Sequence, residues 1–243
     1  MLESIKSFFF KNKTKPNPDI FIARLRSTVI GEGMLSNHNV KLIDYAIKNM
    51  PTDGDILEIG LYAGLSSNLI LHYLELYNKN VQLFGCDIWE YEGFKDKTTQ
   101  KKSIFIDGKK NVLRTNYDAY IKQSYIHACQ LLHPDNLPYA YHLSSDAFFH
   151  NINNNIKVPD VFNREANFPK KLSFCYIDGN HSYDQTKRDF ENVTKLTVKG
   201  GFILLDDTAN NLNFGSAKFA KELKSNDEFK IISKKQNYLI QKR

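Results

Sequence analysis

Three aspartates and one histidine stand at the ends of two apolar runs in the second half of the sequence. Asp178 ends the first run, His181 follows three residues later, and Asp206 and Asp207 end the second run. If both runs are parallel strands, these carboxylates meet at the edge where open α/β sheets bind ligands. Like charges repel unless a cation or protons compensate them, and oxygen-only ligation suits Mg²⁺, Mn²⁺ or Ca²⁺ rather than zinc. We therefore predict a divalent-metal site formed by Asp178, Asp206 and Asp207; the alternative is that Asp206 and Asp207 cap a loop and only one faces the site.

His181 is the candidate base beside this cluster. An imidazole can accept a proton at neutral pH, and His181 lies in the segment that follows Asp178. The other six histidines have no comparable surroundings in the sequence. We interpret His181 and Asp178 as the catalytic residues; the competing interpretation is that His181 is an ordinary loop histidine.

A second constellation, Glu58 to Ser66 (EIGLYAGLS), follows an apolar run and opens a helical segment. Gly60 allows a sharp turn at the strand end, and Gly64 allows the backbone to approach a ligand beside a helix N-terminus. Tyr62 occupies the position of the second glycine in the dinucleotide fingerprint G-x-G-x-x-G, so a pyrophosphate would meet a side chain there. S-adenosylmethionine carries no phosphate and tolerates this change. We predict that the turn binds S-adenosylmethionine; the alternative is an ordinary strand-to-helix turn.

Residues at other predicted strand ends extend this cofactor site. Asp87 ends the second strand, about twenty residues after the glycines, where an acidic residue accepts hydrogen bonds from ribose hydroxyls in nucleotide-binding α/β folds. Ser145 and Asp146 follow the third strand, where methyltransferases commonly contact the adenine; a helix N-cap is the alternative role of Asp146. Glu58 is expected to accept hydrogen bonds at the amino-acid end of the cofactor. The predicted cofactor-binding residues are Glu58, Gly60, Tyr62, Gly64, Ser66, Asp87, Ser145 and Asp146.

Apolar runs typical of strands alternate with segments of helical period, which predicts an α/β fold whose mostly parallel sheet has helices on both faces. The predicted strands cover residues 55–60, 82–89, 139–144, 172–178 and 202–207, and the predicted helices cover 39–50, 65–77, 117–132, 184–196 and 217–223. Gly200 and Gly201 are expected to form a tight turn into the fifth strand. Two closing runs, FKIIS and NYLIQ, are spaced as an antiparallel hairpin. Such a hairpin is typical of class I methyltransferases, whereas Rossmann dehydrogenases more often end in parallel units.

No internal repeat or linker divides the sequence, so we expect one domain over residues 1–243. Residues 1–35 form an N-terminal extension. Residues 90–138 are long for a connection between strands, which is typical of a lid or substrate-binding insertion. This insertion holds a basic cluster composed of Lys95, Lys97, Lys101, Lys102, Lys109, Lys110 and Arg114. We interpret the cluster as contacts to a phosphorylated or nucleotide-linked acceptor, with a solvated face or a nucleic-acid surface as the alternatives.

The combination of D-G-x-H-x-Y from Asp178 to Tyr183, Gly200-Gly201 and Asp206-Asp207 resembles class I methyltransferases of the macrocin and mycinamicin sugar O-methyltransferase type. The resemblance covers about residues 53–208, and Lys199 replaces the proline that is common before the paired glycines. It implies a seven-stranded Rossmann-like sheet, S-adenosylmethionine as the methyl donor, a magnesium ion held by the three aspartates, and the histidine as the base. The acceptor that it implies is a hydroxyl of a sugar or a sugar-containing small molecule.

The net charge of +6 could suit a nucleic-acid binder or an anionic substrate, but the Lys and Arg residues are scattered and no nucleic-acid-recognition motif occurs. No apolar run is long enough to span a bilayer or to form a signal peptide, so we expect a cytoplasmic protein with no membrane partner and no nucleic-acid partner. The alternatives are a nicotinamide-dependent oxidoreductase, a metal-free N- or C-methyltransferase, and a nucleic-acid-binding protein on the same scaffold. The sequence leaves open whether the chain forms a homo-oligomer.

Overall fold

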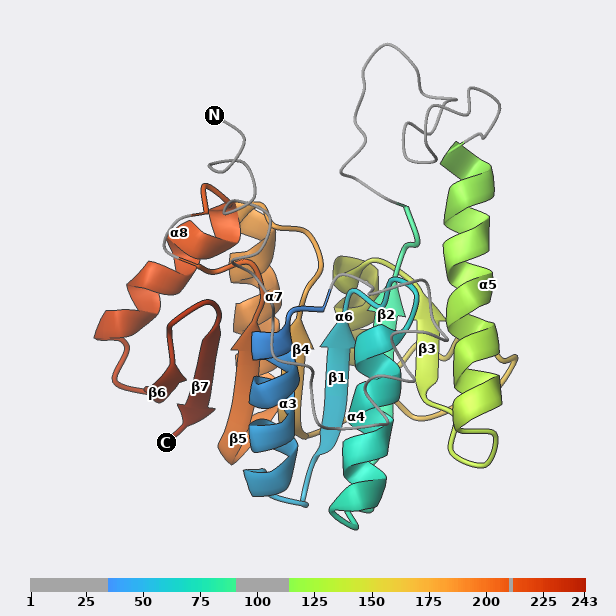
Figure 1. Ribbon diagram of the computed structural model, residues 1–243, viewed down its shortest axis with the longest axis horizontal. Helices are drawn as coiled ribbons and strands as arrows, with labels where there is room; N and C mark the ends of the chain where they lie inside the picture. Colours follow the sequence, from blue (N-terminus) through green and yellow to red (C-terminus); the bar gives the residue numbers. More distant parts are fainter. Residues whose placement is uncertain (1–34, 91–113, 210–211) are drawn as a thin grey trace, which may run out of the picture.

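Seven strands form one mixed sheet in the order β3-β2-β1-β4-β5-β7-β6 (Figure 1). The structure, a computed structural model, describes residues 35–90, 114–209 and 212–243. The strands are β1 Asp55–Ile59, β2 Leu83–Asp87, β3 Tyr139–His142, β4 Leu172–Ile177, β5 Thr197–Leu205, β6 Phe229–Ser233 and β7 Tyr238–Lys242. Strands β1 to β5 run parallel, whereas β7 is antiparallel to both β5 and β6. The predicted Rossmann-like fold is confirmed, including its closing hairpin.

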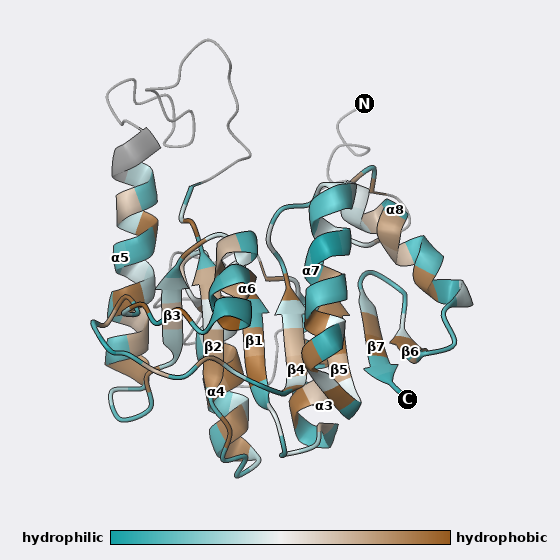
Figure 2. Cartoon of the chain, turned by 180° about the vertical axis from the view of Figure 1, so that it is seen from behind, coloured by the Kyte–Doolittle hydropathy of each residue, from teal (hydrophilic) through white to brown (hydrophobic). Residues whose placement is uncertain are grey.

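Helices cover both faces of the sheet. They are α3 Asn37–Asn49, α4 Leu65–Leu76, α5 Arg114–Leu132, α6 Ser145–Asn154, α7 Tyr183–Leu196 and α8 Gly215–Glu222, with a short 3-10 helix at Leu223–Ser225. Helices α3 and α4 lie on one face and α6 and α7 on the other, where α8 packs beside α7 (Figures 1 and 2). Helix α5 stands beside α4, near the β3 edge. The hydroxyls of Ser36, Ser144 and Ser182 cap α3, α6 and α7 by accepting a bond from the backbone N–H three residues later.

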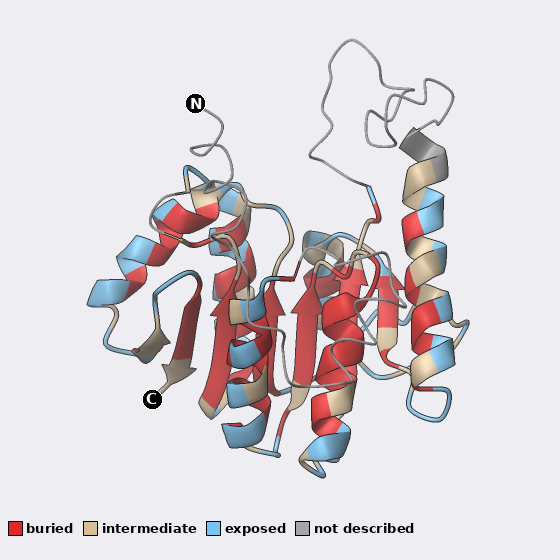
Figure 3. Cartoon of the chain, viewed as in Figure 1, coloured by how far each residue is buried: buried red, intermediate tan, exposed pale blue. Residues whose placement is uncertain are grey.

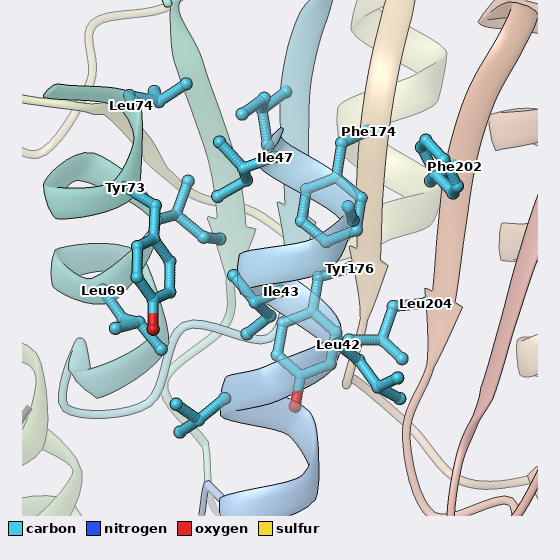
Figure 4. Packing of buried hydrophobic residues seen from close by; sticks show 14 of the residues in the cluster. Leu42, Ile43, Ile47, Leu69, Tyr73, Leu74, Phe174, Tyr176, Phe202 and Leu204 are labelled. Carbon is cyan, nitrogen blue, oxygen red and sulfur yellow. The ribbon is translucent and has the colours of Figure 1, made fainter. Parts of the chain in front are cut away.

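Two apolar layers hold these helices on the sheet. On one face, Ile43 of α3 packs in a cluster with Phe174 of β4 (Figure 4). On the other face, Phe148, Phe190 and Phe219 come from α6, α7 and α8. Because both faces are covered, β1, β4 and β5 are buried along most of their length (Figure 3). That burial accounts for the near-continuous apolar runs from which the strands were predicted.

The Gly200-Gly201 pair lies inside a strand and not in a turn before it. Strand β5 already begins at Thr197, and its register against β4 shifts after Leu172. Gly200 occupies this irregular stretch with a φ of 80°, in the left-handed region that a glycine adopts without steric cost. The prediction of a tight turn was therefore wrong. A bulge within a strand and a turn before a strand both favour glycine, so the glycine pair alone did not distinguish the two.

Two predicted features lie outside the described residues, namely the N-terminal extension up to residue 34 and residues 91–113 of the predicted lid, with the basic cluster from Lys95 to Lys110. The described part of the predicted lid is mainly α5. It packs Ile121 and Tyr125 in a cluster with Leu61 and Trp89. No helix in the described ranges has the length and apolar character needed to cross a membrane.

Candidate active site

The ends of β1, β4 and β5 meet at one edge of the sheet, where backbone hydrogen bonds continue just past the strands. The Asp178 N–H donates to the Ile59 carbonyl (2.8 Å), and the Asp206 N–H donates to the Ile177 carbonyl (3.0 Å). Gly60 directly follows Ile59. The predicted cofactor turn and the predicted carboxylates therefore share the edge at which parallel α/β sheets bind ligands.

The turn after β1 is tight because parts of β4 and α5 lie against it. Gly60 has a φ of 90°, and a Cβ there would lie 2.0 Å from the Asp178 carbonyl oxygen. Gly64 has a φ of 88° and begins α4, and a Cβ there would lie 2.9 Å from the Tyr125 ring. Contacts within the protein thus already require glycine at both positions. They add to the ligand contact that is predicted for Gly64.

Tyr62 ties this turn to β2 and α5. Its φ is 45°, a conformation uncommon for a residue with a side chain. Its carbonyl accepts a hydrogen bond from Trp89 Nε1 (2.9 Å), and its hydroxyl lies 2.6 Å from the Tyr117 hydroxyl on α5. The side chain that occupies the second glycine position of a dinucleotide site is therefore held in a defined place.

Asp87 shapes the same turn through both of its carboxylate oxygens. Oδ2 accepts from the N–H groups of Leu61 (2.7 Å) and Tyr62 (2.9 Å), and Oδ1 accepts from the Trp89 N–H (2.6 Å). A carboxylate oxygen has two lone pairs, so Oδ1 is the atom with capacity left for a ribose hydroxyl. The ribose contact stays a prediction, and the structure gives Asp87 a second task in holding the turn.

Glu58 is fully buried, and the start of α4 occupies its carboxylate. The Ser66 hydroxyl donates to Oε1, and the Ser67 hydroxyl donates to Oε2 (2.5 Å). Burial raises the pKa of Glu58 to about 7, although the two serine bonds lower it. In this structure Glu58 and Ser66 thus fix the helix to the strand, and their predicted contacts with the cofactor remain predictions.

Ser145 and Asp146 begin α6 and are joined to α7 by Gln185. The Gln185 Nε2 atom lies 3.1 Å from both Ser145 Oγ and Asp146 Oδ1, and 3.0 Å from Asp189 Oδ1. The N-cap of α6 is Ser144, so the alternative role of Asp146 as the cap is wrong. Asp146 lies in the first helical turn, where the helix dipole favours a negative charge.

Asp189 is almost fully buried, and its Oδ2 has no hydrogen-bond partner among the described residues. Burial raises the pKa of this carboxyl to about 6, although bonds from Ser145 and Gln185 lower it. A raised pKa favours the protonated carboxyl in the folded state. The stability that the protonated Asp189 carboxyl contributes is therefore present below the unfolded-state pKa of about 3.9. It is lost as the pH rises through about 6.

The variant Asp189→Asn is therefore expected to unfold at a higher temperature than the wild type at pH 8, and at nearly the same temperature at about pH 3.5, below the unfolded-state pKa. The amide stays neutral, so it avoids a penalty of about 3 kcal/mol, which is about 6 °C for a chain of this length. Thermal unfolding followed by circular dichroism at both pH values checks the prediction, with the exposed Asp135→Asn as the matched control. An equal shift at the two pH values would mean that the charge of Asp189 is not the cause.

Asp178 and Asp206 face the same side of the sheet and share one hydroxyl. The Tyr176 hydroxyl lies 3.0 Å from Asp178 Oδ2 and 2.7 Å from Asp206 Oδ2. Burial, followed by the charge of Asp206, raises the pKa of Asp178 well above the usual value for aspartate. The two carboxylates therefore lie close together without a positive side chain between them in the described part of the chain.

Asp207 instead contacts the predicted base. Its Oδ2 lies 3.3 Å from His181 Nε2, and the His181 ring lies 5.4 Å from the exposed ring of Phe214. The described residues contain no group of three or more His, Cys, Asp or Glu side chains arranged to hold a metal ion. The structure thus brings two of the three predicted ligands together and places the third beside the histidine. Asp206 and Asp207 lie past Leu205, the last residue of β5, and Asp207 has a φ of 49°, so the chain has left the strand conformation where the two side chains diverge.

Sequence reasoning missed the polar residues that support this edge. Ser67, Gln185 and Tyr176 touch predicted site residues, and Asn237 Nδ2 donates to Asp206 Oδ1. The period-two spacing of Tyr176 from Asp178 carried a usable signal, because both must face the same side of β4. No spacing in the sequence indicates Asn237, which lies before β7.

The strand order, the glycine turn and the acidic strand ends define a class I S-adenosylmethionine-dependent methyltransferase. A family model described as a methyltransferase domain matches residues 57–208. The match spans more than half of the chain, and the chain belongs to this family of methyltransferase domains. A search of curated proteins found no match.

Solved structures agree with this assignment. The chain resembles an O-methyltransferase from Bacillus cereus in complex with SAH, with a TM-score of 0.53 and 15% identity over 99% of this chain and 98% of that chain. It also resembles the O-methyltransferase TomG from Streptomyces achromogenes in complex with SAM, with a TM-score of 0.54 and 12% identity over 98% of this chain and 96% of that chain. At these identities the likeness shows the fold. The family model confirms the predicted methyltransferase class, in place of a nicotinamide-dependent oxidoreductase, and the fold shared with structures that bind SAH and SAM supports the predicted cofactor.

Proposed function

We propose that this protein transfers the methyl group of S-adenosylmethionine to a hydroxyl of a sugar or sugar-containing small molecule, with a divalent cation in the site. The observation that carries the proposal is the pairing of His181 with Asp207 beside Asp178 and Asp206, at the same edge as the glycine turn. A base beside clustered carboxylates suits an acceptor whose proton must be removed, as that of a hydroxyl must. The two superposed structures are O-methyltransferases by description, which supports oxygen as the acceptor atom.

The chemistry of the carboxylates at this edge suits a hard cation, although the described residues do not hold three of them in one ligand group. Asp178, Asp206 and Asp207 offer only oxygen ligands, which suits Mg²⁺ or Mn²⁺. The carboxylates of Asp178 and Asp206 both lie against the Tyr176 hydroxyl, and a divalent cation between them would offset their mutual repulsion. Asp178 and Asp206 would hold the ion with Asp207 as the third ligand. When bound, such an ion lowers the pKa of an acceptor hydroxyl.

The residues of this chain would carry the remaining steps. His181 would take the proton of the acceptor hydroxyl, and the Asp207 carboxylate beside its Nε2 would orient the ring and stabilise the imidazolium. The turn from Gly60 to Gly64 would hold the donor. The acceptor oxygen would then form a bond to the methyl carbon in line with the departing sulfur, which leaves as S-adenosylhomocysteine (SAH). Much of the rate would come from holding the two reactants in this attack geometry.

The chemical nature of the product tests this proposal. We expect the full chain, given methyl-labelled S-adenosylmethionine and a panel of sugars, sugar phosphates and nucleotide-linked sugars, to form a methyl ether at one hydroxyl. Mass spectrometry and NMR identify the methylated atom. Transfer to nitrogen or carbon would overturn O-methylation, whereas transfer only to hydroxyls of sugar-free compounds would overturn the sugar assignment alone.

A further inference from the structure

A chain of buried amide and hydroxyl groups runs from α3 across the sheet to the ends of β4 and β5. Asn39 and Tyr176 are fully buried and Asn237 is 5% exposed. The Asn39 Nδ2 atom donates to the Tyr176 hydroxyl (3.1 Å), and Asn237 Nδ2 donates to Asn39 Oδ1 (2.6 Å). Three side chains, from α3, from β4 and from the residue before β7, thus form one connected network.

This network ends on the two paired carboxylates. The Tyr176 hydroxyl contacts Oδ2 of both Asp178 and Asp206, at 3.0 and 2.7 Å, and Asn237 Nδ2 also donates to Asp206 Oδ1. The Thr208 N–H donates to Asn237 Oδ1 (3.1 Å), which fixes the amide so that its NH₂ group faces Asp206. Both oxygens of Asp206 and one oxygen of Asp178 are therefore held in place.

The apolar surroundings do not account for these polar groups. Tyr176 belongs to the cluster that includes Leu42, Ile43 and Leu204, and its hydroxyl oxygen points away from Phe174 in Figure 4. A phenylalanine would fill the same space, and a buried polar group costs free energy unless it is hydrogen-bonded. Because its partners here are Asn39 and the two carboxylates, the hydroxyl contributes chiefly to their position.

We propose that Tyr176, Asn39 and Asn237 are positioning residues that hold the carboxylates of Asp178 and Asp206 at the spacing needed to bind a divalent cation. This inference rests on the proposed metal-dependent function. Groups that orient metal ligands through hydrogen bonds commonly change metal affinity by about 10- to 100-fold when removed. Removal of the Tyr176 hydroxyl leaves both carboxylates in the chain, so any loss of metal affinity reports their placement.

Titration of the full chain with Mn²⁺, followed by the electron paramagnetic resonance signal of the free ion, measures that affinity. Tyr176→Phe is expected to bind Mn²⁺ about 10- to 100-fold more weakly than the wild type, with unchanged SAH affinity by calorimetry. The matched control is Tyr141→Phe, because the fully buried Tyr141 hydroxyl has no partner in the described part of the chain. This control is expected to bind Mn²⁺ and SAH as the wild type does.

The outcomes separate this inference from the proposed function. If the wild type binds Mn²⁺ and Tyr176→Phe binds it equally well, the positioning role is wrong and the metal site stands. If the wild type does not bind Mn²⁺, the metal site and the positioning role both fail. A parallel loss of Mn²⁺ and SAH binding in Tyr176→Phe would show a general structural role and would also overturn the inference. Should Tyr176→Phe not fold, Asn39→Ala decides in the same titration, with an expected loss of about tenfold.

Discussion

Methyl transfer by the His181→Ala variant is expected to be slower than that of the wild type by about 10²- to 10⁴-fold, the usual contribution of a positioned general base. His181 follows β4, and its Nε2 lies 3.3 Å from Asp207 Oδ2. The variant therefore lacks the imidazole that is proposed to take the acceptor proton. We expect the substitution to lower turnover and not donor affinity, because the turn from Gly60 to Gly64, which is predicted to hold the donor, follows a different strand.

Three measurements check this expectation. Single-turnover rates with methyl-labelled donor give the chemical step, calorimetry gives the SAH affinity, and thermal unfolding gives the stability. We expect only the first to change, since His181 and Asp207 are both partly exposed and an exposed ion pair stabilises little. The matched control is His127→Ala on the exposed side of α5, which should retain full activity. Wild-type turnover in His181→Ala would remove this residue from the mechanism.

The fold could be predicted because strands buried on both faces leave a continuous apolar mark in the sequence. Strand β4, with the sequence LSFCYI, is buried at every position, and the run that predicts it needs no tertiary information. Element ends were less accurate, by up to three residues for the predicted helices, and α6 was not among the predicted helices. Side-chain caps such as Ser36 and Ser182 decide helix ends locally, and several nearby residues could have served.

The direction of the site side chains was harder to predict than their place. Asp206 and Asp207 both follow β5, yet Asp206 turns to Tyr176 and Asp207 turns to His181. Both residues lie past the last residue of the strand, and Asp207 has a φ of 49°. The prediction of three converging carboxylates considered only their position along the chain, and the backbone conformation beyond a strand end leaves no periodic signal in the sequence.

Hydrogen-bond partners distant in sequence could not be predicted at all. Asn39 and Asn237 are 198 positions apart and meet only because α3 packs over β5 while β7 pairs with β5. Similarly, the sequence does not indicate that the hydroxyls of Ser66 and Ser67 donate to the Glu58 carboxylate, whose cofactor contact stays a prediction. A polar residue binds whichever partner the completed fold brings near it, and that choice leaves no periodic signal.

Removal of divalent cations is expected to abolish methyl transfer, to about one thousandth of the initial rate or less, and to leave SAH binding intact. Lewis-acid activation of a hydroxyl commonly supplies several kcal/mol of transition-state stabilisation, and each 1.36 kcal/mol is about a tenfold change in rate. The measurement is the rate after exhaustive treatment with a chelator, followed by addition of Mg²⁺ or Mn²⁺. Either ion should restore the activity, because both accept oxygen ligands.

The variant Asp178→Asn should imitate the chelated protein even when Mg²⁺ is present, because it removes the charge of one of the proposed ligands. Asp227→Asn, which changes an exposed aspartate in the connection before β6, is the matched control and should respond to chelator and Mg²⁺ as the wild type does. SAH binding by each protein shows whether the fold and the donor site persist. Activity that survives chelation would refute the metal-dependent mechanism. It would still be compatible with O-methylation in which His181 acts without a metal ion. Activity that is lost with chelator but retained in Asp178→Asn would place the ion at ligands other than those proposed.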